Sequence, residues 1–221
     1  MNLPRLLVLT DRSQATVPLR DAVAAAVDGG ARAVVLREKD LPEQERDRLA
    51  EQLHAVLDPV GGVLIRAGAA GGPALHLAAA DPLPVVRPAL LGRSCHSPDE
   101  LARARAEGCD YVMLSPVFPT ASKPGYGPPL GLAGLAGLTP TAPPTYALGG
   151  VRPADVIGCL AAGAHGVAVM GPVMRAPALV PAYLAALAEG SALALARADH
   201  TADLGVAAGA PDAGDPGTAR R

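Results

Sequence analysis

The sequence is poor in aromatic residues, with one Phe, four Tyr and no Trp among its 221 residues. Half of the residues are nonetheless apolar, so a core must be built from Ala, Val and Leu. Small side chains of this kind pack closely and favour layers of helix on strand. The shortage of aromatics therefore directs the fold assignment towards an α/β protein.

Paired cysteines and a basic surface are also lacking. Cys95, Cys109 and Cys159 are widely spaced, which indicates neither a disulfide framework nor a zinc site and is typical of a reducing cytosol. The net charge of -2 and the isoelectric point near 6.2 argue against a nucleic-acid-binding surface, which needs a basic stripe. Partners are therefore expected to be small molecules, and association into a homo-oligomer stays open.

Long apolar runs are absent as well. No segment reaches eighteen uninterrupted apolar residues, and the run at residues 6–9 is too short for a signal peptide. We therefore expect a soluble, cytoplasmic protein that is not bound to a membrane.

What the chain does contain is an alternation of short apolar runs with helical patterns. A run at residues 5–10 precedes helical periodicity over residues 17–27, which stops at Gly29-Gly30. Further runs are short enough to be strands buried on both faces, and lie at 33–36, 63–65, 75–77, 89–91, 110–114, 145–148 and 166–170. Further helices are predicted at 42–57, 98–107, 153–162 and 179–198. Between the third and fourth strands there is room for a single helical turn at most.

Eight strands that alternate with helices predict a single (β/α)8 TIM barrel over residues 1–198. A doubly wound open sheet is the alternative. Residues 199–221 contain Ala, Gly, Asp, Pro and Arg without a period, so we expect them to form a disordered tail.

In such a barrel the active face is formed by the loops that follow the strands, and phosphate is often held after strands seven and eight. Those positions hold Gly149-Gly150 and Gly171-Pro172. Glycines let backbone N–H groups approach an anion closely. The pattern predicts a phosphate site, although each glycine could simply turn the chain.

Two other loops contribute polar side chains. The loop after strand six contains Thr120, Ser122 and Lys123, which could bind an oxyanion or close over a substrate. After strand two, Arg37 and Lys39 stand in an alternating run of charges at the barrel mouth. The alternatives are an exposed proline-rich loop and a solvated charge cluster.

One of the five histidines stands out. His96 lies in Gly92-Arg93-Ser94-Cys95-His96-Ser97, where strand five ends. An imidazole titrates near neutral pH, as a proton-transfer group should. His76, inside strand four, could point inwards, although a hydrogen-bonded core histidine is the commoner outcome.

Taken together, these motifs resemble the thiamine phosphate synthase / thiazole tautomerase superfamily of TIM barrels. They follow the order of that family and extend from residue 5 to about residue 190. The matching segments are Leu9-Thr10-Asp11, Leu36-Arg37-Glu38-Lys39, Leu75-His76-Leu77 with Asp81, Gly92 to Ser97, Cys109 to Val112, Pro116 to Thr120 with Lys123, Leu148 to Val151, and Gly163-Ala164 with Gly166 to Met170.

The resemblance implies one of two activities in thiamine biosynthesis. The synthase joins an aminopyrimidine diphosphate to a thiazole phosphate and expels pyrophosphate with magnesium. It typically has Gln two residues before the strand-two arginine and an Asn-Asp pair after strand three, where this chain has Val35 and Arg66-Ala67. Only Asp81 matches a metal-binding acid of that family, and one carboxylate is a poor magnesium site.

The tautomerase branch aromatises a carboxythiazole phosphate by moving a proton, without a metal or other cofactor. Its strand-five motif reads much like Gly92 to Ser97, so the resemblance implies that His96 shuttles the proton. Gly149, Gly150 and Gly171 would hold the phosphate of the thiazole substrate, and Arg37 or Lys39 its carboxylate. We therefore expect a thiazole tautomerase-like isomerase, with a magnesium-dependent synthase and a non-catalytic precursor-binding barrel as alternatives.

Overall fold

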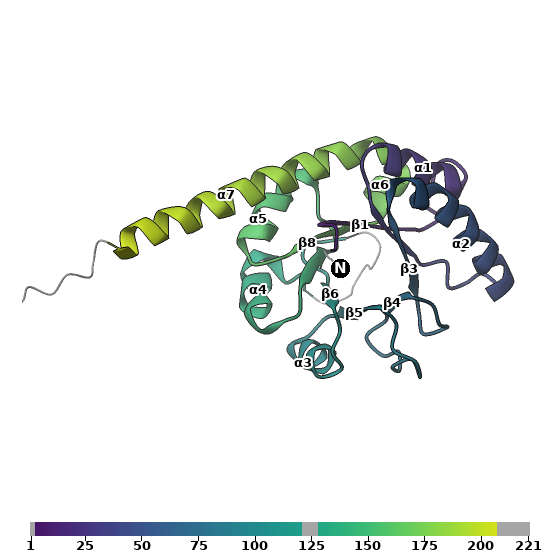
Figure 1. Cartoon of the computed structure of the whole chain (residues 1–221), viewed down its shortest axis with the longest axis horizontal. Coiled ribbons are helices and arrows are strands. Elements are labelled where there is room, and N and C mark those ends of the chain that lie inside the picture. The colour runs from purple at the N-terminus through teal and green to yellow at the C-terminus, as the bar shows by residue number, and fades with distance from the viewer. Residues whose placement is uncertain (1–2, 121–127, 207–221) are drawn as a thin grey trace, which may run out of the picture.

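The computed structural model describes residues 3–120 and 128–206, and eight parallel strands in it close into a barrel in chain order (Figure 1). Closure is made by β1 and β8, where Leu6 pairs with Val167 and Val8 with Val169. This confirms the predicted barrel and excludes the open sheet. The strands are β1 (Leu6–Leu9), β2 (Ala33–Leu36), β3 (Val63–Ala67), β4 (Ala74–Leu77), β5 (Leu90–Cys95), β6 (Tyr111–Leu114), β7 (Thr145–Leu148) and β8 (Gly166–Val169).

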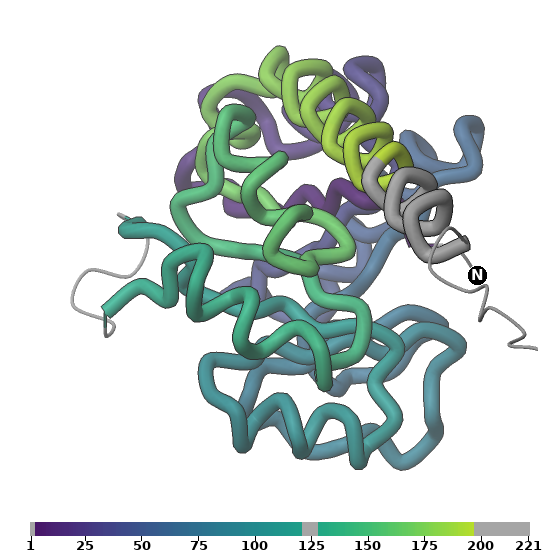
Figure 2. Tube along the Cα trace, turned by 90° about the vertical axis from the view of Figure 1, so that its left-hand side faces the viewer, coloured from purple at the N-terminus to yellow at the C-terminus, as the bar shows by residue number. Residues whose placement is uncertain are grey.

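Helices cover most of the outside of the barrel (Figures 1 and 2). They are α1 (Leu19–Asp28), α2 (Glu43–Leu57), α3 (Pro98–Ala106), α4 (Gly131–Leu138), α5 (Val156–Ala161), α6 (Gly171–Arg175) and α7 (Val180–Val206), with 3-10 turns at Asp58–Val60 (η1), Thr139–Thr141 (η2), Pro153–Asp155 (η3) and Pro177–Leu179 (η4). The sequence pattern did not predict α4, because its sequence GLAGLAGL has a glycine at every third position, which weakens the helical signal.

The barrel separates two apolar cores. Small side chains from the helices and the outer strand faces form the larger one. Inside the barrel, Leu7, Val35, Ile65 and Met113 pack together with Tyr111 and Tyr146. The few aromatic residues are thus used where the widest space has to be filled, since Tyr111 and Tyr146 are fully buried.

The barrel wall has no helical cover beside β4. Residues 68–73 connect β3 to β4, and residues 78–89 connect β4 to β5, with no helix in either segment (Figure 1). The first connection can be this short because Gly68, Gly71 and Gly72 adopt positive φ angles of 104, 93 and 130°. The loop after β4 is therefore held by side chains rather than by a helix of its own.

The last helix extends further than the sequence predicts. We expected helix to residue 198 and irregular backbone beyond it, but α7 continues to Val206, where Ala and Leu still favour a helix. Residues 207–221 lie outside the described part. On α7, Tyr183 is fully buried and its hydroxyl donates to the Val151 carbonyl at 2.9 Å, which docks the helix on the barrel.

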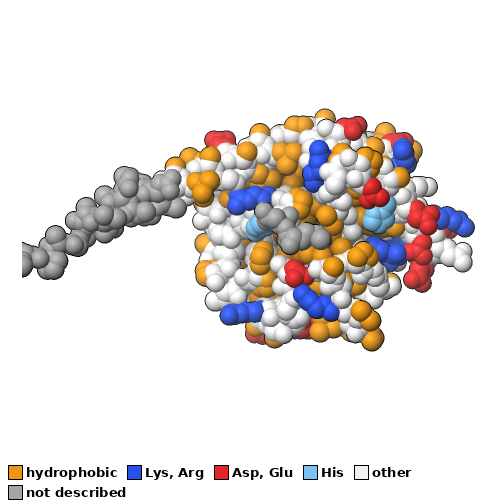
Figure 3. Space-filling view, in the orientation of Figure 1, with side chains coloured by type: hydrophobic (Ala, Val, Ile, Leu, Met, Phe, Trp, Pro, Cys, Tyr) orange, Lys and Arg blue, Asp and Glu red, His pale blue; other side chains and the backbone are white. Residues whose placement is uncertain are grey.

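One stretch passes a length and composition test for a membrane span. Residues Pro177–Ala196 have a mean hydropathy of 1.6, and 22% of this stretch is buried. Apolar side chains lie where α7 leaves the body of the molecule (Figure 3), and Leu193 and Leu195 are exposed. A single such helix is weak evidence for a membrane, because helices that pack on a core pass the same test.

Candidate active site

A cavity of about 800 Å³ opens at the carboxyl ends of the strands, and its lining includes residues at or just after the end of every strand. Its lining brings together most of the residues predicted from the sequence: His96, Arg37, Lys39, Thr120, Gly149, Gly150 and Gly171. Asp81 is next to this group, because its carboxylate pairs with Lys39. Ser122 and Lys123 lie outside the described residues.

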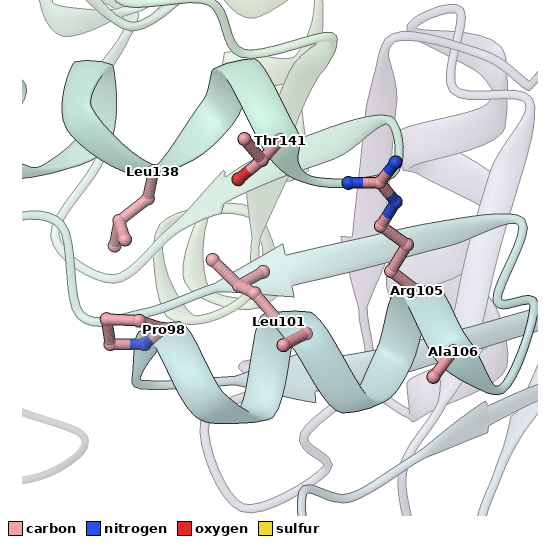
Figure 4. Close-up of a pocket in the computed structure, with 7 residues that line it drawn as sticks. Pro98, Leu101, Arg105, Ala106, Leu138 and Thr141 are labelled. Atoms are coloured by element: carbon pink, nitrogen blue, oxygen red, sulfur yellow. The ribbon is translucent and has the colours of Figure 1, made fainter.

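A smaller cavity of about 420 Å³ lies outside the barrel (Figure 4). Leu101 and Arg105 of α3 face Leu138 and Thr141 across it. Arg105 is its single ionisable lining residue, and there is no acid, histidine or cysteine to move a proton. The cavity at the strand ends is therefore the candidate active site.

His96 is held in one orientation at the end of β5. Its backbone N–H donates to Glu100 Oε2 at 2.5 Å, and its ring Nδ1 lies 2.7 Å from the Ser115 carbonyl oxygen. A carbonyl can only accept, so Nδ1 carries a proton and donates it. The strand-end position thus holds the imidazole of His96 at the cavity wall.

Gly149 and Gly150 allow the loops after β6 and β7 to meet. Their φ angles are 95 and 66°, and a Cβ on Gly150 would lie 2.4 Å from the Pro119 carbonyl oxygen. The Phe118 N–H donates to the Gly149 carbonyl at 3.0 Å, which joins the two loops. These glycines are required by both the turn and the close approach, and they leave backbone at the cavity wall.

Cations line the cavity beside β2. Lys39 Nζ lies 3.2 Å from Asp81 Oδ2, which also accepts from the Ala78 N–H at 2.8 Å. Although burial opposes it, these two contacts hold the pKa of Asp81 below its ordinary value. Arg37 is exposed at the cavity, and its backbone N–H donates to Thr10 Oγ1 at 2.9 Å.

The two acids that alternate with these cations in the sequence, Glu38 and Asp40, are paired with Arg12, which the sequence did not single out. Arg12 Nη1 lies 2.9 Å from Glu38 Oε2, and its Nη2 bonds Asp40. Glu38 is buried, whereas Asp40 is exposed. The single charge of Arg12 is thus shared by two carboxylates, and Lys39 pairs with Asp81, so Arg37 is the cation of this group that forms no salt bridge among the described residues.

A magnesium site built by the protein does not fit these residues. Among the side chains that the structure describes, those of residues 3–120 and 128–196, no group of three or more His, Cys, Asp or Glu is placed to share a metal ion. Asp81 already pairs with Lys39, and Arg66 at the end of β3 pairs with Asp47 at 2.7 Å. The single acid that matched the family's metal ligands, Asp81, is therefore already in an ion pair with the ammonium of Lys39.

Sequence reasoning gave no role to Ser94, Arg175 or Gln14, and it favoured a hydrogen-bonded core position for His76. Ser94 and His76 line its floor and are hydrogen-bonded to each other at 2.9 Å. Arg175 of α6 bonds Gln14 beside Gly171, at the edge between β1 and β8. Ser94 could have been found from strand alternation, since it lies two residues from Gly92 and His96 on the same face of β5.

Known proteins of similar sequence agree on a family. The family model described as thiamine monophosphate synthase matches residues 6–173. A thiamine-phosphate synthase of Moorella thermoacetica is 34% identical over 77% of this chain and 87% of its own length. Another, of Methanoculleus marisnigri, is 39% identical over 70% of this chain and 79% of its own length.

A solved structure agrees on the fold. The thiamine phosphate pyrophosphorylase of Pyrococcus furiosus superposes with a TM-score of 0.72. It is 24% identical, and the match covers 84% of this chain and 96% of that structure. At this identity the likeness supports the barrel alone.

These findings correct the expected activity. We expected a thiazole tautomerase, an isomerase, from the motif around His96. The relatives at 34 and 39% identity carry the name thiamine-phosphate synthase instead, and no comparison supports the tautomerase branch specifically. The histidine motif is compatible with both activities, whereas the similarity along the whole barrel favours the synthase. The chain belongs to the thiamine monophosphate synthase family.

Proposed function

We propose that the chain is a thiamine-phosphate synthase, a transferase that joins an aminopyrimidine diphosphate to a thiazole phosphate. The bond between the pyrimidine methylene carbon and the diphosphate oxygen breaks, and a bond from that carbon to the thiazole nitrogen forms. Pyrophosphate leaves with the electron pair. The observation that carries this proposal is one cavity lined both by the cations beside β2 and by the glycines after β7 and β8.

The cationic wall would bind the leaving group. Arg37 and Lys39 lie where a diphosphate could accept charge-assisted hydrogen bonds, which are roughly twice as strong as neutral ones. Their charge also stabilises the negative charge that develops as pyrophosphate departs. Thr120 is at the rim of the same cavity, and Ser122 and Lys123 remain predictions for the same role.

The glycines after β7 and β8 would hold the second substrate. Backbone N–H groups around Gly149 and Gly150 can approach the thiazole phosphate because these residues have no side chain, and at Gly171 the side chains of Gln14 and Arg175 lie beside the backbone. This arrangement would leave the thiazole nitrogen to face the pyrimidine across the cavity. The volume of about 800 Å³ is in the range of sites that enclose small organic ligands.

In the synthase we assign His96 to substrate positioning. With Nδ1 donating to the Ser115 carbonyl, the ring is held at the cavity wall, where it would contact the pyrimidine and fix its orientation. Magnesium, if it takes part, would supply charge neutralisation of the diphosphate. No step is assigned to it, since the described residues do not form a site for it.

The test is condensation by the purified chain. Supplied with both substrates and magnesium chloride, it should release pyrophosphate in equal amount to thiamine phosphate. Lys39→Gln should lower kcat/KM by about 10- to 100-fold, because one charge-assisted contact to the diphosphate contributes about 1.5–3 kcal/mol. Pyrophosphate release measured with a coupled enzyme reports both results.

The matched control is Arg105→Gln, which removes a cation that lines the smaller cavity outside the barrel. It should leave kcat/KM unchanged. Binding of both substrates without any release of pyrophosphate would contradict the synthase and favour a non-catalytic binding barrel.

The substitution His96→Asn distinguishes the role of Nδ1 from the role of the rest of the ring. The Asn amide can keep the hydrogen bond to the Ser115 carbonyl. The rest of the imidazole ring, including Nε2, is lost without a replacement. We expect kcat/KM for the aminopyrimidine diphosphate to fall by about 10- to 100-fold, with the KM for the thiazole phosphate unchanged. His165→Asn is the control, because His165 bonds the Leu3 carbonyl outside the cavity; equal losses in both variants would refute the role of His96.

A further inference from the structure

Three polar side chains form an unbroken hydrogen-bonded row at the floor of the cavity. The Tyr111 hydroxyl lies 3.1 Å from His76 Nδ1, and His76 Nε2 lies 2.9 Å from Ser94 Oγ. Tyr111 and His76 are buried, whereas Ser94 is partly exposed at the cavity. We name these residues the Tyr111–His76–Ser94 relay.

Gly92 makes this row possible. On neighbouring strands His76 pairs with Gly92, and Gly92 pairs with Tyr111. A Cβ on Gly92 would lie 2.1 Å from the Tyr111 ring, so the ring occupies the space of the missing side chain. The His76 and Tyr111 rings therefore stack across Gly92, with centroids 5.5 Å apart and planes inclined by 24°.

The direction of these hydrogen bonds follows from the buried phenol. Among the described side chains of residues 3–120 and 128–196, the Tyr111 hydroxyl has no hydrogen-bond partner other than His76 Nδ1. A buried O–H that donates to nothing is costly, so it must donate to Nδ1. Nδ1 is then unprotonated, and the single proton of the neutral imidazole sits on Nε2.

The proton on Nε2 determines what Ser94 can do. Since Nε2–H donates to Ser94 Oγ, the serine oxygen is already an acceptor, and its own O–H is left to donate into the cavity. Burial, with the nearby charges of Lys39 and Arg37, lowers the pKa of His76 to about 3, so the ring is neutral at physiological pH. The relay therefore keeps one polarity over the working range of the protein.

We propose that Tyr111 and His76 are positioning residues that orient Ser94 so that its O–H donates into the cavity, and that the site thereby favours a ligand with an acceptor atom above Ser94. Under the proposed function, on which this inference rests for its ligand, the acceptor is an oxygen of the diphosphate or an unprotonated nitrogen of the pyrimidine ring. Because His76 Nε2–H uses one lone pair of Ser94 Oγ, an N–H-bearing group at that point would have to share the same oxygen and should bind less well than an acceptor.

The polarity can be measured without any substrate. Nitrogen-15 NMR of the ligand-free protein labelled in histidine should show His76 protonated on Nε2 and not on Nδ1. In Tyr111→Phe the donor to Nδ1 is gone, so we expect the Nδ1-protonated form to become populated. Tyr146→Phe is the control, because its hydroxyl donates to the Pro4 carbonyl and it is equally buried; it should leave the His76 signals unchanged.

Binding and kinetics then test the consequence. Tyr111→Phe should lower kcat/KM about tenfold, Tyr146→Phe should not, and in a Ser94→Ala background Tyr111→Phe should have no further effect. Titration calorimetry of wild type and Ser94→Ala with inorganic pyrophosphate, and separately with the aminopyrimidine alcohol, shows which ligand supplies the acceptor. If Ser94→Ala binds pyrophosphate more weakly than wild type does, a diphosphate oxygen lies above Ser94. If it binds the aminopyrimidine alcohol more weakly, a ring nitrogen lies there.

The outcomes separate this inference from the proposed function. An Nδ1-protonated His76 in wild type overturns the relay even if the chain is an active synthase. The relay is also overturned if the losses of kcat/KM in Ser94→Ala and Tyr111→Phe add up in the double variant. The opposite outcome is also possible to recognise. If the chain does not condense the substrates, but His76 is protonated on Nε2 and its tautomer changes in Tyr111→Phe, the synthase is refuted and the polarity of the relay stands.

Discussion

Arg93→Met is expected to lower the free energy of unfolding by about 3–5 kcal/mol, because it removes one partner of a buried ion pair. Arg93 is fully buried, and its Nη2 lies 2.7 Å from Glu107 Oε2. Its Nη1 donates to the carbonyls of Ala78 at 2.9 Å, Ala79 at 3.1 Å and Asp81 at 2.9 Å. These bonds hold the loop after β4 against the barrel, at a place where no helix covers the wall. Urea denaturation followed by circular dichroism measures the loss.

The chain contains a matched control in Arg103. Its guanidinium also bonds the Ala79 and Asp81 carbonyls, at 3.0 and 3.3 Å, and pairs with Glu107 at 2.7 Å. Its side chain is 43% exposed, however, so Arg103→Met should cost about 1 kcal/mol or less. Equal stability of the two variants would show that burial of Arg93 does not hold the loop.

A second consequence of Arg93→Met concerns the active site. The Asp81 carboxylate receives the Ala78 N–H and pairs with Lys39 within the loop that Arg93 holds. If that loop shifts, Lys39 loses its orientation, and the KM for the aminopyrimidine diphosphate should rise. The same rise is not expected for Arg103→Met.

The sequence predicts the barrel well because each strand is a short apolar run between polar residues. It also predicts that active-site residues follow these runs, and His96, Arg37, Lys39 and Gly149 do line one cavity. Their meeting depends only on parallel strands with their carboxyl ends on one face, which is a property of the fold.

Side-chain partners could not be predicted in the same way. Arg93 stands within the motif around His96, yet it points to the outer face of β5 and bonds the loop after β4, 12 to 15 residues earlier in the chain. Arg12 neutralises Glu38 across a sequence separation that no local pattern encodes. The choice between tautomerase and synthase failed for a related reason, since a single motif was weighed more heavily than similarity along the whole barrel.

Because His76 is buried, we also expect the free energy of unfolding to depend strongly on pH. Burial, followed by the charges of Lys39, Arg37 and Arg93, lowers its pKa from 6.5 to about 3, and the nearby carboxylate of Asp81 opposes this only weakly. Above pH 6.5 the ring is neutral in both the folded and the unfolded chain, so its contribution is fully present. As the pH falls below 6.5, the unfolded chain binds a proton that the folded chain does not, and stability is lost until the folded pKa is reached.

The expected loss is about 1.4 kcal/mol for each pH unit, or about 2–3 kcal/mol between pH 6.5 and 4.5. Urea midpoints at half-unit intervals measure it, and this window lies above the ordinary titration of most carboxylates. His76→Gln should flatten the slope, whatever its stability at pH 7. His54→Gln replaces a histidine whose side chain is 49% exposed and should keep the slope of the wild type. A wild-type slope that His76→Gln leaves unchanged would mean that His76 is not buried in its neutral form, and it would remove the electrostatic support for the Tyr111–His76–Ser94 relay.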